Sequence, residues 1–89
     1  MHRVVLSRRA VADLRRVDPG HRLDRLQAGL ERLAEGDSNL DIKPLTDNHP
    51  WLRLRLGDWR VLFRPAGDLL LVARIVHRRE LRQAIRALG

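Results

Sequence analysis

The spacing of apolar residues changes from three and four to two at about residue 51, and this change limits the possible folds most strongly. Before it, four leucines recur at the period of one helix face: Leu23, Leu26, Leu30 and Leu33. After it, apolar and polar residues alternate, as in a half-buried β-strand. Each pattern leaves an apolar face that must be covered. The sequence therefore predicts an antiparallel sheet with two helices packed on one side.

The residues before position 18 predict a short strand and a helix. Val4 and Val5 favour a strand over His2–Leu6, and Ser7 is a suitable N-cap for the helix that follows. The apolar face of this helix is expected to consist of Ala10, Val11, Leu14 and Val17. Its opposite, solvent-exposed face is expected to carry the charged residues Arg8, Arg9, Asp13, Arg15 and Arg16.

A short break separates this helix from the leucine-rich one. Asp18 can cap the second helix with Pro19 in its first turn, and Gly36 follows the last periodic residue, where a C-terminal glycine belongs. Because the break is so short, we expect the two helices to form an antiparallel hairpin. The polar residues Asp37–Pro50 include two prolines and are expected to form a loop.

Three strands and a helix are predicted after residue 50. Gly57-Asp58 has the composition of a two-residue turn between residues 51–56 and Trp59–Arg64. A turn at Pro65–Asp68 then leads to the apolar run Leu69–Val76, which is typical of a central strand. A short helix is expected over Arg79–Leu88. The chain is thus expected to be one domain, residues 1–89, with an α/β fold of the α+β type: a strand, a two-helix hairpin, an antiparallel three-stranded meander and a short helix.

The turn at Gly57-Asp58 decides which side chains share a face of this hairpin. One face pairs apolar residues only: Leu56 with Trp59, Leu54 with Val61, and Leu52 with Phe63. The other face pairs Arg55 with Arg60, Arg53 with Leu62, and Trp51 with Arg64. We call the surface formed by five of these residues the arginine face: Trp51, Arg53, Arg55, Arg60 and Arg64.

The arginine face favours a site for a polyanion. Directly opposed like charges such as Arg55 and Arg60 repel, and cross-strand pairs matter at about 0.2–1 kcal/mol, so folding gains nothing from them. A bound polyanion would turn this repulsion into attraction, and Trp51 on the same face could stack a base. The alternative is an ordinary charged surface whose long side chains spread into water.

The overall charge agrees with a polyanion partner. The formal net charge is +7, and residues 53–89 carry nine basic and three acidic residues, against nine and eight in residues 1–52. A localised basic surface is typical of a polyanion binder.

The four histidines lie far apart in the sequence, so neither a metal nor a cofactor is expected. The absence of cysteine suits a reducing cytoplasm, and the longest apolar run, Leu69–Ala73, is too short to cross a membrane.

Two motifs resemble the RelE/ParE superfamily of bacterial toxins. Residues 51–63, WLRLRLGDWRVLF, resemble the central hairpin of RelE-type toxins, and His77-Arg78-Arg79-Glu80 resembles their C-terminal element. The opening strand with its Arg-Ala…Asp-Leu helix matches as well, as does Lys43-Pro44-Leu45, so the resemblance spans nearly the whole chain. It implies the toxin of a type II toxin–antitoxin system that cleaves messenger RNA on the ribosome. Cleavage would proceed through attack by the neighbouring 2′-hydroxyl, without a metal.

The resemblance also implies roles and partners. The catalytic residues would be Arg53, Arg55, Arg60 and Arg79. Contacts to RNA are expected from Trp51, Arg64, His77 and Arg78. The expected partners are a cognate antitoxin, messenger RNA and the ribosome, with operator DNA reached through the antitoxin.

Three features leave other interpretations open. The chain has no tyrosine, and Arg82 or Gln83 falls where many ribosome-dependent members carry one. Arginine stays protonated at neutral pH and is a poor general base. His77 is the ionisable candidate near the cluster, but it could equally cap the last strand. The alternatives are a ParE-like toxin that inhibits a topoisomerase by binding, and a weakly active or inactive relative.

Overall fold

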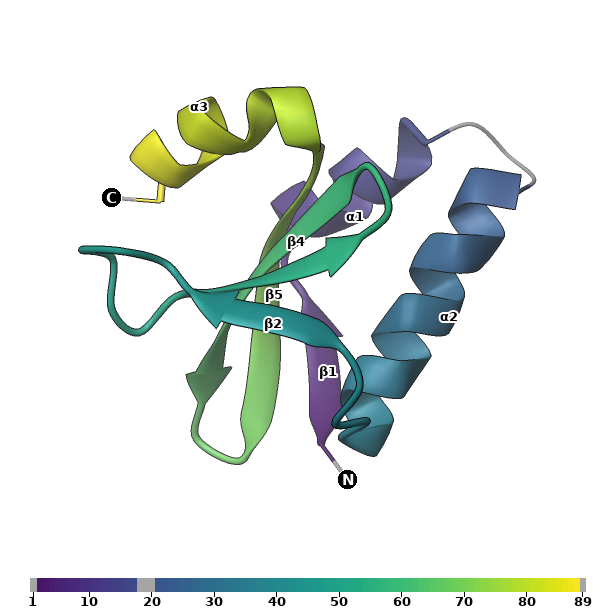
Figure 1. Ribbon diagram of the computed structural model, residues 1–89, viewed down its shortest axis with the longest axis horizontal. Helices are drawn as coiled ribbons and strands as arrows, with labels where there is room; N and C mark the ends of the chain where they lie inside the picture. The colour runs from purple at the N-terminus through teal and green to yellow at the C-terminus, as the bar shows by residue number, and fades with distance from the viewer. Residues whose placement is uncertain (1, 18–20, 89) are drawn as a thin grey trace.

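A computed structural model of the chain describes residues 2–17 and 21–88 (Figure 1). A five-stranded sheet has the order β1-β5-β4-β3-β2. Its strands are β1 (Arg3–Leu6), β2 (Asp41–Pro44), β3 (Leu52–Leu56), β4 (Trp59–Ala66) and β5 (Leu69–His77). The helices are α1 (Arg8–Arg15), α2 (His21–Glu35) and α3 (Leu81–Arg86), and a 3-10 turn, η1 (Arg78–Glu80), precedes α3.

The predicted α+β architecture is confirmed, including the meander formed by β3, β4 and β5. These strands pair antiparallel, and β2 extends the antiparallel part of the sheet. In contrast, β1 pairs parallel to β5 at the other edge, with Arg3 opposite Leu69. The sheet is therefore mixed, and not antiparallel throughout as the sequence predicted.

The prediction of a loop over Asp37–Pro50 is wrong in part, because Asp41–Pro44 forms the edge strand β2. All four residues of β2 are exposed, and Ile42 is the one large apolar side chain among them. An exposed edge strand pairs through its backbone alone and needs no apolar alternation, so periodicity could not reveal it. Pro44 ends the strand, a position that proline tolerates at a sheet edge.

The turn predicted at Pro65–Asp68 is shorter than expected. β4 continues through Pro65 and Ala66, and the turn consists of Gly67-Asp68. Pro65 is accepted because β3 pairs with β4 only as far as Phe63, so β4 has β5 alone as its neighbour there. In both hairpins the turn glycine has a positive φ, 61° at Gly57 and 64° at Gly67. Glycine is favoured at that first turn position.

Helices α1 and α2 pack on the same face of the sheet, as predicted. Their side chains share one core with the strands. The buried residues of this core are Ala10 and Val17, Leu26 and Leu33 of α2, and Leu54, Val61, Phe63, Val72 and Ile75 of the strands. Each helix contacts the sheet more extensively than it contacts the other helix, so the expected antiparallel hairpin is not closely packed. The predicted cap at Asp18 and Pro19 lies outside the described residues.

The leucine stripe and the end of α2 follow the sequence prediction. Leu23 and Leu30 are partly buried beside the two buried leucines of the stripe, and Gly36 has a positive φ of 75° just after the helix. At Gly29, an added Cβ atom would collide with the Leu56 side chain. Glycine therefore allows the close approach of α2 to β3, since a larger residue would have to displace the Leu56 side chain.

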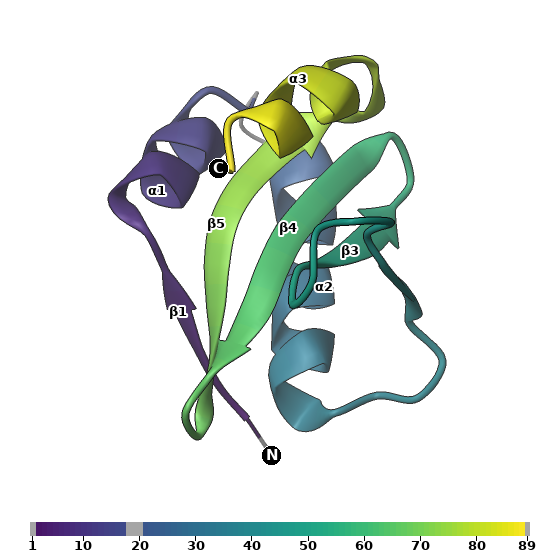
Figure 2. The same ribbon diagram turned by 90° about the vertical axis from the view of Figure 1, so that its left-hand side faces the viewer.

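A second, smaller core lies on the opposite face of the sheet, beneath α3 (Figure 2). Leu62, Val76 and Ala84 are buried in it, and the predicted apolar side of the last helix, Leu81, Ile85 and Leu88, packs against them. Strand β4 thus separates two cores: Val61 and Phe63 face α1 and α2, while Leu62 faces α3.

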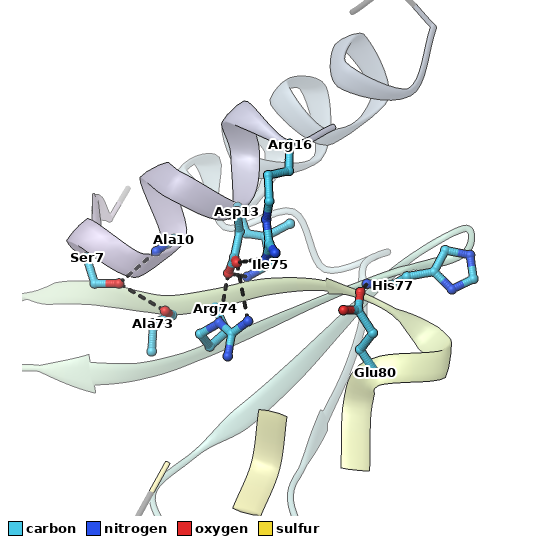
Figure 3. A network of polar contacts seen from close by, with 9 residues as sticks. All are labelled: Ser7, Ala10, Asp13, Arg16, Ala73, Arg74, Ile75, His77 and Glu80. Atoms are coloured by element: carbon cyan, nitrogen blue, oxygen red, sulfur yellow. Dashed lines mark hydrogen bonds and ion pairs between the residues drawn. The ribbon is translucent and has the colours of Figure 1, made fainter. Parts of the chain in front are cut away.

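Asp13 departs from the prediction, which placed it on the solvent-exposed side of α1. Only 2% of the residue is exposed, and its carboxylate accepts a 2.9 Å hydrogen bond from the backbone N–H of Ile75 (Figure 3). Arg74 donates to the same carboxylate through Nε at 2.9 Å, and Arg16 through Nη2 at 2.7 Å. The reason is the sheet edge: β1 ends opposite Val72, so β5 beyond that point needs another hydrogen-bond partner.

Ser7 supplies the same kind of support at the start of α1. Its side chain caps α1, as predicted, by accepting from the Ala10 N–H at 3.1 Å. Its hydroxyl also donates to the Ala73 carbonyl oxygen at 2.9 Å. Ser7 and Asp13 therefore attach α1 to the edge of β5 where β1 has ended.

The charge of Asp13 is stabilised by these contacts. Burial alone would raise the pKa of Asp13, but the hydrogen bonds from Arg74, the Ile75 N–H and Arg16 outweigh it and lower the pKa below its ordinary value. A lowered pKa in the folded state means that the ionised form stabilises the fold. This contribution is complete above the unfolded-state pKa of about 3.9, and is lost as the pH falls through the lowered value.

We expect Asp13→Asn to reduce the free energy of unfolding by about 3–5 kcal/mol at neutral pH, because it leaves the Arg74 charge buried without its partner. The loss should shrink below about pH 4. Chemical denaturation of both proteins across this pH range measures it. Asp68→Asn, in the exposed β4–β5 turn, is the control and should change little. Equal stability of wild type and Asp13→Asn at neutral pH would contradict the account.

Candidate functional site

The register of β3 and β4 is the predicted one and creates the arginine face. Arg55 lies opposite Arg60, Arg53 lies opposite Leu62, and Leu54 lies opposite Val61. Leu54 and Val61 are completely buried on the helix side of the sheet. Because successive side chains of a strand alternate between faces, burial of these two residues turns Arg55 and Arg60 to the other face.

Arg60 is held in place by the hairpin turn beside it. Its Nη1 donates to the Gly57 carbonyl oxygen at 2.7 Å and to the Trp59 carbonyl oxygen at 2.9 Å. These bonds use one end of the guanidinium group and fix its plane. Nη2 and Nε lie outside the two bonds, so a fixed donor edge remains for a ligand.

Arg60 lies in a strongly positive environment. Partial burial lowers the pKa of Arg60, and the nearby positive charges of Arg55, Arg53 and Arg78 lower it further, against a smaller opposite effect of Asp58. Arginine still remains charged at neutral pH. A guanidinium group surrounded by three like charges is electrostatically unfavourable in the free protein, and an anion bound there would relieve the repulsion.

Acidic residues hold two of the neighbouring arginines. Asp41 of β2 accepts from Arg53 Nη2 at 3.4 Å, and only 16% of the Arg53 side chain is exposed. Asp58 in the turn lies 3.6 Å from Arg78 Nε, and its carbonyl oxygen accepts a 2.8 Å bond from the Arg78 N–H. This backbone bond attaches η1 to the hairpin turn, which brings Arg78 to Arg60.

Sequence reasoning missed two residues of this surface, Asp41 and Lys43. Lys43 lies opposite Arg53 in the register of β2 and β3, so it adds a positive charge to the same side of the sheet. Both were assigned to a loop. Asp41 and Lys43 alternate with Ile42 and Pro44, which is the pattern of a strand. Two residues on each face are too few to predict a strand from this pattern.

Trp51 and Arg64 meet as predicted at the start of β3. The Arg64 guanidinium carbon lies 5.6 Å from the centre of the Trp51 ring, within the range of a cation–π contact. One face of the Trp51 ring is therefore covered by a positive charge. Trp51 as a whole is half-buried, so part of the residue remains accessible.

The structure does not bring His77 to the arginine face. His77 lies opposite Trp59 in the β4–β5 register, and the two rings are 5.6 Å apart in an edge-to-face arrangement on the helix side of the sheet. His77 Nδ1 also accepts from the Arg79 N–H at 3.3 Å, and Glu80 accepts from the His77 N–H. These contacts are those of a capping residue at the end of the last strand.

The positions of Arg79 and Leu62 also bear on this surface. Arg79 is exposed in η1, directly after Arg78, whose charge is one of those that lower the pKa of Arg60. Leu62, which pairs with Arg53 on the same side of the sheet, is completely buried beneath α3 and offers no apolar surface to a partner.

The described residues, 2–17 and 21–88, contain no group of three or more histidine, cysteine or acidic side chains that could hold a metal ion. Within the same part of the chain, no helix is long and apolar enough to cross a membrane.

Comparisons with known proteins identify relatives over most of the chain. A family described as the ParE toxin of the type II toxin–antitoxin system parDE matches residues 4–82. Toxin RelE3 of Methanocaldococcus jannaschii is 30% identical over 83 residues, which cover 89% of this chain and 93% of that protein.

Two solved structures contain chains with a similar fold. The RelB–RelE antitoxin–toxin complex from Methanococcus jannaschii contains a chain with a TM-score of 0.75 and 26% identity, covering 90% of this chain and 96% of that one. A chain of the Escherichia coli DinJ–YafQ complex has a TM-score of 0.70 at 16% identity, covering 91% of this chain and 98% of its own length. The second likeness concerns the fold alone.

We expect Arg55→Gln to stabilise the free protein by about 0.2–1 kcal/mol at low salt, because it removes the charge that directly opposes Arg60. The gain should fade as salt screens the repulsion. Thermal or chemical unfolding at two salt concentrations measures it, with Arg25→Gln on the far side of α2 as the matched control. An Arg55→Gln protein no more stable than the control at low salt would show that the arginines do not repel each other measurably.

Proposed function

The chain belongs to the RelE/ParE superfamily of type II toxin–antitoxin toxins, and from this premise we propose that it is a ribosome-dependent messenger RNA endonuclease. The supporting observation is the positive charge of Arg55, Arg53 and Arg78 near Arg60, whose guanidinium group is fixed by turn carbonyls. Such a cluster suits a reaction in which negative charge increases at phosphorus.

The proposed chemistry takes its nucleophile from the RNA. The 2′-oxygen attacks the adjacent phosphorus, the bond from phosphorus to the 5′-oxygen breaks, and the products are a 2′,3′-cyclic phosphate and a free 5′-hydroxyl. The proton of the 2′-hydroxyl leaves to solvent and the departing 5′-oxygen gains one, so the step is balanced. Arginines cannot take up a proton at neutral pH. Their contribution is to stabilise the dianionic phosphorane through bidentate hydrogen bonds.

Arg60 is proposed to bind the phosphorane most directly, with Arg55 beside it. Arg53 is proposed to orient the RNA, since its pairing with Asp41 fixes its position. The resemblance assigns the remaining catalytic role to Arg79, whereas the charge from η1 that lowers the pKa of Arg60 is that of Arg78. We therefore propose both residues as candidates, to be separated by substitution.

A cognate antitoxin is the proposed protein partner. The related chains in the Methanococcus jannaschii RelB–RelE structure and in a second Escherichia coli DinJ–YafQ structure are described as parts of antitoxin–toxin complexes. The exposed positive charges of the arginine face suit an acidic segment of such a partner. Operator DNA would then be reached through the antitoxin.

The second candidate function is inhibition of a topoisomerase by binding. The family that matches residues 4–82 is described as a ParE toxin, which favours this alternative. So does the structure around His77, because its ring lies away from the arginine face and offers no base to a nuclease. The arginine cluster favours the nuclease, since binding alone does not require a fixed donor edge at Arg60.

We expect Arg60→Ala to reduce cleavage of ribosome-bound message about a hundred- to thousandfold, because removing one oriented donor to a transition-state anion has an effect of that size. Loss of a merely screening charge should change the rate only a few-fold and should matter less at high salt. Arg25→Ala on α2 is the matched control. Thermal unfolding first confirms that wild type and both variants are equally stable, so that a lower rate does not reflect loss of the fold.

A rate for Arg60→Ala within a few-fold of wild type would remove Arg60 from the catalytic set. Arg78→Ala and Arg79→Ala in the same assay decide which of the two neighbouring arginines acts with it. If the wild-type protein stops growth but never cleaves message, the nuclease proposal fails and topoisomerase inhibition replaces it.

A further inference from the structure

A pocket lies between α1, β5 and the end of α3, next to the arginine face. Its volume is about 330 Å³. Trp51 borders it, and the other lining residues come from those three elements and their ends: Ser7, Arg9, Ala73, Arg74, Ala84, Ala87 and Leu88. None of these residues apart from Trp51 belongs to the arginine face.

The lining suits a flat, largely apolar group with polar edges. Three alanines and Leu88 provide small apolar walls, and the polar groups are few, as is usual for small-molecule sites. Trp51 contributes an aromatic ring that Arg64 already covers from one side at 5.6 Å. A planar ring inside the pocket could stack against Trp51, and every nucleobase has the face needed for this contact.

Arg74 provides a rigid donor at the same pocket. Its Nε and Nη2 are bound to the buried carboxylate of Asp13 at 2.9 and 3.3 Å, and only 13% of its side chain is exposed. The guanidinium group is therefore held in one orientation, and its Nη1 lies outside the pair with Asp13. Arg9 is exposed at the start of α1 and adds a second positive charge to the pocket.

We propose that this pocket binds a nucleobase of the single-stranded RNA, stacked on Trp51, with Arg74 at the base edge and Arg9 at a neighbouring phosphate. The inference rests on the proposed function, because it assigns a subsite for the same RNA. Trp51 directly precedes β3 and is four residues from Arg55, which corresponds to about 13 Å of extended chain. A few nucleotides of extended strand cover that distance, so RNA bound at Arg55 and Arg60 would lead into the pocket.

Tryptophan fluorescence tests the proposal without requiring cleavage. The chain has two tryptophans, so in a Trp59→Phe variant all tryptophan fluorescence comes from Trp51. The probe is a short 2′-O-methylated oligoadenylate or oligouridylate, which lacks the attacking hydroxyl. We expect saturable quenching of Trp51. Ala87→Phe should fill the pocket, abolish the quenching and weaken binding about tenfold, an effect within the usual range for loss of one stacked base. Ala28→Phe, exposed on α2, is the matched control.

Each other outcome has a definite meaning. Quenching that Ala87→Phe leaves unchanged means that RNA stays on the arginine face; the pocket proposal then fails and the proposed function stands. If Ala87→Phe leaves RNA binding unchanged but weakens antitoxin binding, the pocket is a contact for the antitoxin. That result also overturns the proposal. If no variant, including wild type, binds or cleaves RNA, both proposals fail.

A second comparison avoids dependence on the Trp59→Phe background. Trp51→Ala should weaken binding of a labelled oligonucleotide about tenfold, whereas Trp51→Phe should largely retain it because phenylalanine also stacks. Equal binding by the two variants would contradict stacking at this position.

Discussion

The two-residue turn at Gly57-Asp58 fixes the register of β3 and β4, and every part of the proposed site depends on that register. It buries Leu54 against Val61 and thereby places Arg55 opposite Arg60. The turn also supplies the Gly57 carbonyl that orients Arg60 and the Asp58 carbonyl that holds the backbone of Arg78. A shift of one residue would exchange the two faces and bury the arginines, so the core and the site support the same pairing.

The second constraint is the attachment of α1 to the open edge of β5. Asp13 replaces the missing neighbour strand by accepting from the Ile75 N–H, and it keeps its charge because Arg74 and Arg16 donate to it. Removing one member of such a buried pair is costly, because it leaves the other charge without a partner. The same ion pair holds Arg74 rigid beside the pocket near Trp51, so one interaction serves both stability and the proposed RNA contact.

Periodicity predicted the elements that bury an apolar face and missed those that do not. The leucines of α2 and the alternation of β3 and β4 were sufficient for the fold and for the pairing of Arg55 with Arg60. Strand β2 was missed because an exposed edge pairs through its backbone, whose hydrogen bonds leave no pattern in the side chains. Asp13 was misplaced because a helical pattern assigns a charge to solvent, and only the end of β1 explains why this one is buried. His77 could not be assigned to a face until the pairing with Trp59 was known.

The central claim is that a toxin with this arginine face cleaves messenger RNA on the ribosome. The most direct measurement is translation of a defined message with and without the protein, followed by mapping of the 5′ ends and of the chemistry of the upstream 3′ ends. The account predicts new 5′ ends within the translated region, 2′,3′-cyclic phosphates on the upstream fragments, and neither when ribosomes are omitted. An intact message at protein concentrations that block a topoisomerase and stop growth would contradict it.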